Sequence, residues 1–169
     1  ENMSWITTGT VTYEGNTYTV ADYYEDEIPA IDGGYLLEMD IHRDEVSSVQ
    51  TYSGLNINIK NPEFCISNTA MLNYVKDYLQ AVENACISED YTITYNGVSV
   101  RYTDLCDLDS MVKWWMVNEV FFNWDAGFNS NFMYKDHGTK LIFGPVWDMD
   151  ITAGGYGTSY LYDQWQTWY

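Results

Sequence analysis

FFNWDAGFNSNFMYKDHGTKLIFGPVWDMDITAG, residues 121–154, places acidic residues on both sides of a β-hairpin pattern. Asp125 opens a polar loop, whereas Asp148 and Asp150 follow the apolar run LIFGPVW. In extended backbone, residues i and i+2 face the same side, so we expect these last two carboxylates to share one face. Paired carboxylates beside glycines, which allow a ligand to approach closely, favour a hard cation. The alternative interpretation of DMD alone is a solvated loop.

The amino-acid composition excludes several classes of protein. The 169 residues are 46% hydrophobic, which is enough for one domain with a core and argues against disorder. The 25 acidic residues outnumber the 7 Lys and Arg, and the formal net charge is -18. This field repels nucleic acid and anionic membranes, so we expect no nucleic-acid partner and no membrane insertion. A bound polyphosphate would need metal ions to bridge it to so acidic a chain.

The start of the chain and its cysteines say less about fold and function than the composition does. The chain opens at ENMSWITTG without an initiator Met, and we therefore expect an interior piece of a larger protein. No signal-peptide pattern is visible. The three cysteines are an odd number without metal-ligand spacing, and the sequence leaves open a Cys65–Cys86 or a Cys86–Cys106 disulfide.

Hydrophobic periodicity predicts a mixture of strands and helices. Apolar residues at +3 and +4 predict a helix from Ser67 or Asn68 to Cys86. Residues 107–124, capped by Asp107 or Asp109, are apolar almost all round, and we expect this helix in the middle of the core, with Trp114 and Trp115 buried. Alternation and turn residues predict hairpins and strands at 10–20, 35–41, 55–59, 92–102 and 132–144.

The order of these features matches a phosphoryl-transfer site. An apolar helix ends at Asp125, a polar loop follows, and a hairpin leads to Asp148. Protein kinases use this arrangement: one Asp orients and deprotonates the attacking hydroxyl, a nearby Asn holds a metal, and a second Asp binds the metal that bridges the phosphates. Phosphoryl transfer mostly requires positioning and cancellation of charge, which oxygen ligands and Mg²⁺ provide.

Two segments carry a resemblance to a known family. FFNWDAGFNSNFMYKD followed by LIFGPVWDMDITAG is similar to the signature of the CotH kinase family, the spore-coat protein H type of atypical protein kinase. GGYLLEMD and DLDSMVKWWMVNEV also resemble members of that family, so the likeness extends from about Gly33 to Gly155. The two-part acidic motif is far more specific than an isolated D-x-D.

The resemblance implies particular roles for the residues of this motif. Asp125 would be the catalytic Asp, and Asp148 the residue that binds Mg²⁺ or Mn²⁺ with bound ATP. Asn129 stands where the family often has a polar metal or loop ligand, and Ser130 also matches a polar position. Asp150 belongs to the motif and is a further candidate metal ligand.

The resemblance also implies the fold and the domain organisation. We expect an α+β, protein-kinase-like fold, represented mainly by its helical C-lobe with β-hairpins, in a single domain over residues 1–169. The basic, glycine-rich phosphate-binding half is expected upstream of this chain. Lys135, between the two acids, is the candidate phosphate contact, and Glu38 the candidate hinge acid beside the nucleotide. A solvated lysine and a structural acid are the alternatives.

Three functions remain open from the sequence. The first is a secreted bacterial kinase, associated with the cell surface or wall, that phosphorylates Ser, Thr or Tyr of an extracellular or coat protein. The second is a non-catalytic surface module that keeps the fold and binds carbohydrate or protein through its many aromatic residues. The third is a glycosyltransferase that uses D-x-D, although the chain lacks the alternating strand–helix pattern of a nucleotide-binding α/β sheet.

Overall fold

The computed structural model describes residues 5–13, 16–24, 31–123, 125–150 and 152. Its strands are β1 (Trp5–Tyr13), β2 (Asn16–Tyr24), β3 (Tyr35–Met39), β4 (Ser48–Gln50), β5 (Asn56–Asn61), β6 (Thr92–Tyr95), β7 (Val98–Arg101), β8 (Asn131–Lys135) and β9 (Ile142–Phe143). Its helices are the 3₁₀ helix η1 (Glu63–Ser67) and the α-helices α1 (Thr69–Ile87), α2 (Tyr102–Leu105) and α3 (Leu108–Val120).

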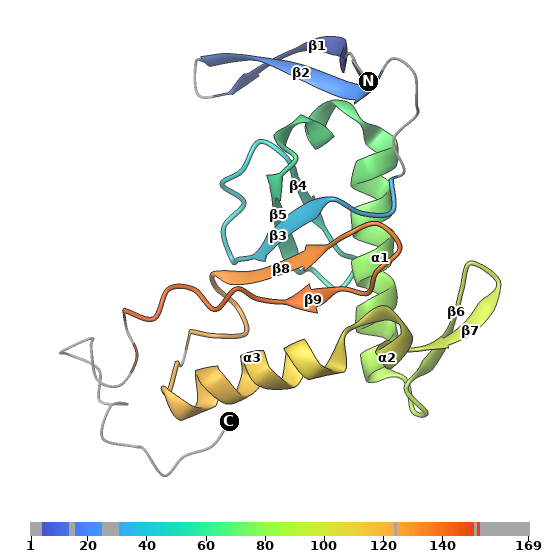
Figure 1. The fold of residues 1–169 in the computed structure, drawn as a ribbon, viewed down its shortest axis with the longest axis vertical. Coiled ribbons are helices and arrows are strands. Elements are labelled where there is room, and N and C mark those ends of the chain that lie inside the picture. The colour runs from blue at the N-terminus through green and yellow to red at the C-terminus, as the bar shows by residue number, and fades with distance from the viewer. Residues whose placement is uncertain (1–4, 14–15, 25–30, 124, 151, 153–169) are drawn as a thin grey trace.

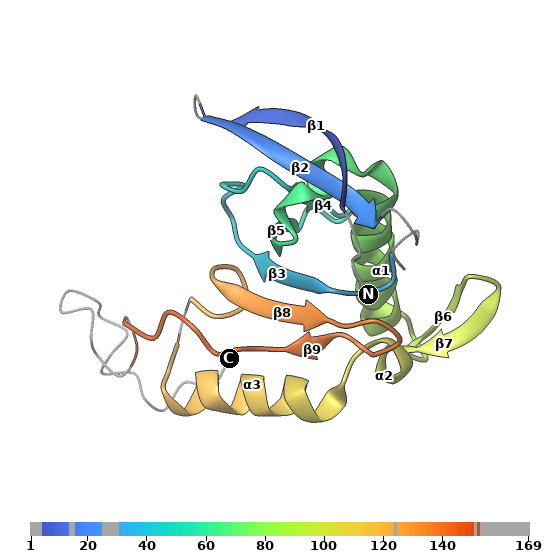
Figure 2. The same cartoon turned by 45° about the horizontal axis from the view of Figure 1, so that its top comes forward.

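A five-stranded sheet in the order β4-β5-β3-β8-β9 forms the centre of the described residues, and all of its neighbouring strands are antiparallel. Helix α1 crosses one face of this sheet, and α3 runs alongside β9 at the edge (Figures 1 and 2). The β1–β2 and β6–β7 hairpins form separate two-stranded sheets. The α+β class is therefore confirmed. The expected predominance of helices is not, because the sheet and not a helical bundle is the centre.

The hydrophobic core lies between this sheet and α1. Alternate residues of the central strands point to one face, and a stripe on α1 covers them. The fully or nearly fully buried residues of this layer include Leu37, Ile57, Ile59, Met133, Val75, Leu79 and Ala85. Small residues on α1 allow the helix to approach the strands closely.

Helix α1 begins and continues as its sequence predicts. The Asn68 side chain accepts hydrogen bonds from the backbone N–H groups of Ala70 at 3.1 Å and Met71 at 3.2 Å. These are two of the four donors that have no partner within a helix. The hairpin predicted at 92–102 is also confirmed, and Asn96 and Gly97 have the positive φ angles that a type I′ turn requires.

Helix α3 differs from its prediction. Asp107 caps it by accepting a 2.7 Å hydrogen bond from Ser110 N–H, as expected. However, it is not in the middle of the core: Trp114 is half-buried against Phe143, whereas Trp115 is 50% exposed. The expectation that Trp115 is buried is therefore wrong. One side of α3 packs beside β9, and within the described residues no element covers the other side.

The start of β3 is joined to the β8–β9 turn by a polar clamp. The Asp32 carboxylate accepts a 2.9 Å hydrogen bond from Gly138 N–H and lies 2.9 Å from His137 Nδ1. The hydrogen bond with His137 lowers the pKa of Asp32. Gly33 passes so close to this turn that a Cβ atom on it would lie 2.1 Å from the backbone nitrogen of His137, so glycine is required there. The clamp holds one end of the β3–β8 pair.

The cysteines and the helices give two further findings. Cys65, Cys86 and Cys106 are free thiols, so neither disulfide that the sequence left open is present. Burial raises the pKa of both Cys65 and Cys106 to about 12. Within the described ranges, no helix combines the length and the apolar character that crossing a bilayer would require.

Replacing the α1 cap tests this account of the fold. Asn68→Ala should lower the free energy of unfolding by about 1 kcal/mol, because two helix N–H groups lose their acceptor. Urea denaturation followed by circular dichroism measures the change. Asn73→Ala, at an exposed position inside the same helix, is the matched control and should change stability little. Equal losses in the two variants would contradict the capping role.

Candidate functional site

The loop after α3 rests on buried amide side chains. Phe122 turns the chain with a φ of 53°, and Asn123 N–H then donates to the Asn118 carbonyl at 2.8 Å. The buried Asn123 side chain donates to Asn118 Oδ1 at 2.9 Å and lies 3.6 Å from the Met149 sulfur. The end of α3 is thereby joined to the loop that contains Asp148 and Asp150.

Asp125 and Asn129 form one compact turn. The Asn129 side-chain amide donates to Asp125 Oδ1 at 2.8 Å, and Asn129 N–H donates to the Asp125 carbonyl at 3.3 Å. Asn129 Oδ1 in turn accepts from Ile41 N–H at 3.4 Å, which connects the turn to the residues after β3. The half-buried Asp125 carboxylate is therefore held in one orientation while part of its surface stays open to solvent.

Ser130 connects this turn to two further acids. Its backbone N–H donates to Asp40 Oδ2 at 3.3 Å, and its hydroxyl donates to Asp148 Oδ2 at 3.2 Å. Its φ of 49° lies in the left-handed region, which non-glycine residues rarely adopt. Residues with such backbone angles are found more often at functional sites than elsewhere. Ser130 therefore contacts Asp148 directly after the residue that contacts Asp125, and the assignment of these residues to a catalytic site stays a prediction.

The backbone before Asp148 departs from the sequence expectation. Strand β9 ends at Phe143, and Asp148 has a φ of 56°, so the two acids of DMD do not follow an extended strand. The argument that Asp148 and Asp150 share one face therefore fails. Asp150 is exposed, two residues beyond Asp148. Trp147 packs edge-on against Phe132 of β8, with ring centroids 6.0 Å apart, and this contact positions the start of the acidic loop.

Glu38 lies in β3 and is not part of this network. Its buried carboxylate lies 3.2 Å from Lys60 Nζ and accepts a 3.4 Å hydrogen bond from the Asn58 side chain. Lys60 also pairs with Glu45. Burial acts to lower the pKa of Lys60, but the hydrogen bonds that its ammonium group donates to Glu45 and Glu38 outweigh burial, and the pKa is raised. The nucleotide role of Glu38 stays a prediction, and its contacts here are those of a buried ion pair.

Lys135 lies at the opposite end of β8 from Asn131, about 13 Å away along the strand. Its buried ammonium group donates to the Asp32 carbonyl at 2.6 Å and lies 5.0 Å from the Tyr78 ring centroid and 5.8 Å from that of Tyr74. Burial lowers its pKa. Its predicted phosphate contact stays a prediction; in this structure Lys135 joins the polar clamp at the start of β3.

Two residues of this region were missed by the sequence analysis. Asp40 accepts from the Ser130 and His42 backbone N–H groups, and it is the acid directly after β3, whereas Glu38 is inside the strand. Its place at the strand end was the available signal. Asn131 is 5% exposed at the start of β8, and its side-chain nitrogen has no partner. Leaving a buried amide nitrogen without an acceptor costs folding free energy. The Asn131 nitrogen is therefore a free hydrogen-bond donor close to the acids.

The side chains of this region include the kind of oxygen donor that a magnesium or manganese ion prefers. Asp125, Asn129 and Asp148 offer carboxylate and amide oxygens, which are the ligands that these hard cations prefer. Within the part of the chain that the structure describes, no group of three or more His, Cys, Asp or Glu is arranged to hold a metal by itself. Mg²⁺ characteristically binds through one or two carboxylates together with substrate phosphates and water, so two acids suffice when a nucleotide is bound.

Comparison with known families places the chain in one of them. A family model described as CotH kinase protein matches residues 16–168. The chain therefore belongs to the CotH kinase protein family, and kinase-type phosphotransferase activity follows from that membership as the class of reaction to test. The kinase-like fold is implied by the family. No curated protein and no solved structure was found to match the chain.

Removing the Asp40 carboxylate tests how the network is held. In Asp40→Ala, Ser130 N–H loses its acceptor, and its amide should exchange with solvent at least about tenfold faster, corresponding to about 1.4 kcal/mol of lost protection. Hydrogen exchange measured by NMR gives the rate. Asp109→Ala, which removes an exposed ion pair with Lys113 on α3, is the control. Unchanged Ser130 exchange would show that Asp40 does not position this loop.

Proposed function

We propose that this chain carries the phosphoryl-transfer site of a metal-dependent protein kinase that uses ATP. The observation that carries the proposal is a pair of hydrogen bonds from adjacent residues: the Asn129 side chain donates to Asp125, and the Ser130 hydroxyl donates to Asp148. Two acids far apart in sequence are thereby each hydrogen-bonded to one of two neighbouring residues of the same loop, which supports a shared role. Family membership supports the same class of reaction.

Asp148 and Asn129 are the proposed metal ligands, and Asp150 is a further candidate from the same loop. When bound, Mg²⁺ or Mn²⁺ neutralises charge on the phosphate oxygens. Ser130 orients the Asp148 carboxylate by donating to one of its oxygens, which leaves the other oxygen as the candidate ligand atom. Asn129 donates through its amide nitrogen to Asp125, and its oxygen, which accepts one long hydrogen bond from Ile41 N–H, has a second lone pair for a cation.

Asp125 is the proposed catalytic residue. Its carboxylate accepts the proton of the attacking Ser, Thr or Tyr hydroxyl as the hydroxyl oxygen forms a bond to the γ-phosphorus of ATP. The bond between the γ-phosphorus and the β–γ bridging oxygen breaks, and ADP leaves with that oxygen. The Asn129 amide holds the Asp125 carboxylate in place from one side, so the other oxygen faces the incoming hydroxyl.

The net negative charge of the chain supports a metal-dependent reaction, and it also bears on where the phosphate-binding residues lie. With a net charge of -18, the chain repels free ATP, so phosphate-binding basic residues are proposed to lie upstream of it in the complete protein. The resemblance to the spore-coat protein H type supports a secreted bacterial protein, associated with the cell surface or wall. Its proposed substrate is an extracellular or coat protein.

Two substitutions in the complete protein test the assignment. Asp125→Asn should reduce turnover by roughly 10²–10⁴-fold, or about 3–5 kcal/mol, while metal and ATP still bind, because it removes only the proton acceptor. Asp148→Asn should weaken Mn²⁺-dependent ATP binding as well. Calorimetry measures binding, and phosphate transfer from labelled ATP to an added protein measures turnover.

Asp109→Asn, an exposed acid on α3, is the matched control and should keep both properties. Circular dichroism and thermal melting on the same samples separate a chemical loss from unfolding. A folded Asp125→Asn variant with unchanged turnover would exclude Asp125 as the catalytic residue. If the unsubstituted protein binds a sugar or a protein but transfers no phosphate, the non-catalytic module is favoured.

A further inference from the structure

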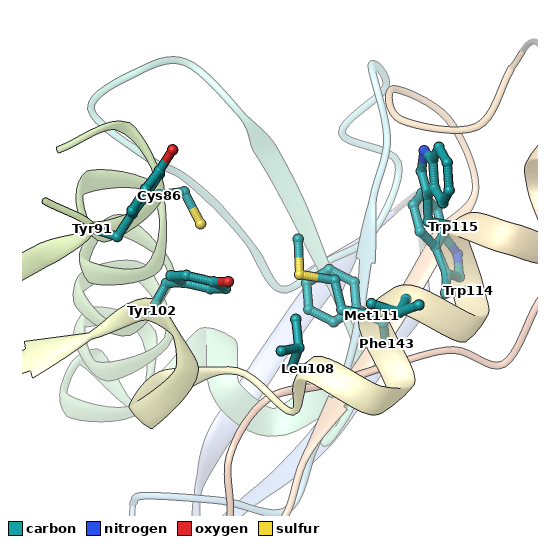
Figure 3. A pocket seen from close by; sticks show the side chains of 9 residues that line it. Cys86, Tyr91, Tyr102, Leu108, Met111, Trp114, Trp115 and Phe143 are labelled. Atoms are coloured by element: carbon teal, nitrogen blue, oxygen red, sulfur yellow. The ribbon is translucent and has the colours of Figure 1, made fainter. Parts of the chain in front are cut away.

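An apolar hollow of about 440 Å³ lies between the end of α1, the β6–β7 region and the N-terminal half of α3. Figure 3 shows Cys86, Tyr91 and Tyr102 across it from Leu108 and Met111. Nine described residues line the hollow, and five of them are aromatic. The acidic loop follows the other end of α3, so the hollow is separate from the candidate site.

Hydrogen bonds hold the walls of the hollow in place. Phe143 N–H of β9 donates to the Ser110 hydroxyl at 3.1 Å, which fixes the start of α3 against the sheet. On the other wall, Tyr102 N–H donates to the Tyr91 carbonyl at 3.2 Å, and the two rings meet edge-on with centroids 5.9 Å apart. Protein interiors leave few voids larger than a water molecule. A space of this size between two fixed walls is therefore a preformed pocket.

The size of the hollow favours a small molecule over part of another protein. Clefts of about 300–1,000 Å³ with mainly apolar and aromatic walls are typical of small-molecule sites. With about 440 Å³, this hollow is near the lower end of that range. A sphere of that volume is about 9 Å across, whereas an α-helix with its side chains measures about 10–12 Å. A helix of a partner protein is therefore too wide to enter.

The chemistry of the walls excludes a charged ligand. None of the nine described lining residues is ionic, and the charged pair Asp109–Lys113 of α3 lies outside the lining. Burying a charge without a partner is costly, and the net charge of -18 would also repel an anion. The Tyr102 side chain points across the hollow toward Met111 (Figure 3). Since a tyrosine hydroxyl can donate or accept, it suits a ligand with one hydrogen-bonding group.

We propose that this hollow binds a small, uncharged aromatic molecule with a single hydrogen-bonding group. Aromatic walls favour a ring system because edge-to-face and offset-stacked contacts add to the free energy gained by burying apolar surface. Leu108 and Tyr91 are 44% and 50% exposed, so the hollow is open to solvent and such a molecule can enter. This inference does not depend on the proposed kinase activity.

Titration with N-phenylnaphthylamine, an uncharged aromatic probe with one N–H group, tests the proposal. Its fluorescence rises in apolar surroundings, and the rise should saturate at one molecule per chain. Leu108→Asp should weaken the apparent affinity at least about tenfold, because it places a carboxylate in the wall. An acid at the N-terminus of α3 is favourable for the helix itself. Val98→Asp, at a 61% exposed valine outside the lining, is the matched control and should bind the probe normally.

Cys86 provides a second measurement that needs no substitution. Its half-buried thiol lines the hollow, whereas Cys65 and Cys106 are buried elsewhere. Saturating N-phenylnaphthylamine should slow alkylation of Cys86 by iodoacetamide at least about tenfold, as measured by mass spectrometry, because the bound probe covers the thiol. Circular dichroism identifies a variant that has not folded, and in that case the Cys86 measurement decides the proposal.

Three results would overturn the proposal. The first is a fluorescence rise that does not saturate, or that Leu108→Asp and Val98→Asp reduce equally. The second is a saturating probe that leaves the alkylation rate of Cys86 unchanged. The third is one probe molecule per two chains together with a dimer in sedimentation, because the hollow would then lie in an interface between two copies of the chain.

Discussion

The antiparallel pairing of β3 with β8 is the constraint on which the rest of the structure depends. Its register sets Met39 opposite Asn131 and Tyr35 opposite Lys135. The residues just beyond one end of the pair therefore meet, and Asp40 reaches the backbone of Ser130. A shift by one residue would turn every side chain of β8 to the other face of the sheet and would separate these groups.

The two ends of this strand pair have different chemistry for physical reasons. At the start of β3, Lys135 is buried among tyrosine rings and backbone carbonyls, so its donors are occupied and its pKa is lowered by burial. At the other end, the acids lie in loops that are half-buried or exposed, where charged carboxylates remain hydrated. Ser130 and Asp148 adopt strained backbone angles there, which the surrounding hydrogen bonds maintain. The polar groups are buried and paired at one end, and the carboxylates are open to solvent at the other.

Much of this arrangement could be predicted from local patterns. The cap of α1 at Asn68 follows from side-chain chemistry, and the β6–β7 hairpin follows from the turn residues Asn96 and Gly97. Long-range facts could not be predicted in this way. The exposure of Trp115 depends on which elements pack around α3, and periodicity alone does not reveal that. The choice between Asp40 and Glu38 depends on where β3 ends, and strand boundaries are the least certain part of any sequence interpretation.

Paramagnetic broadening by Mn²⁺ in the presence of ATP, observed in the amide NMR spectrum, tests the central claim most directly, because it detects even weak binding. The account predicts that broadening is strongest for the amides of Ile41, Asn129, Ser130 and Met149. Those of Asn96 and Gly97, in the distant β6–β7 turn, should be unaffected, and Asp148→Asn should abolish the effect. Broadening spread over the exposed acids and unchanged by Asp148→Asn would contradict a metal–nucleotide site at this end of the β3–β8 pair.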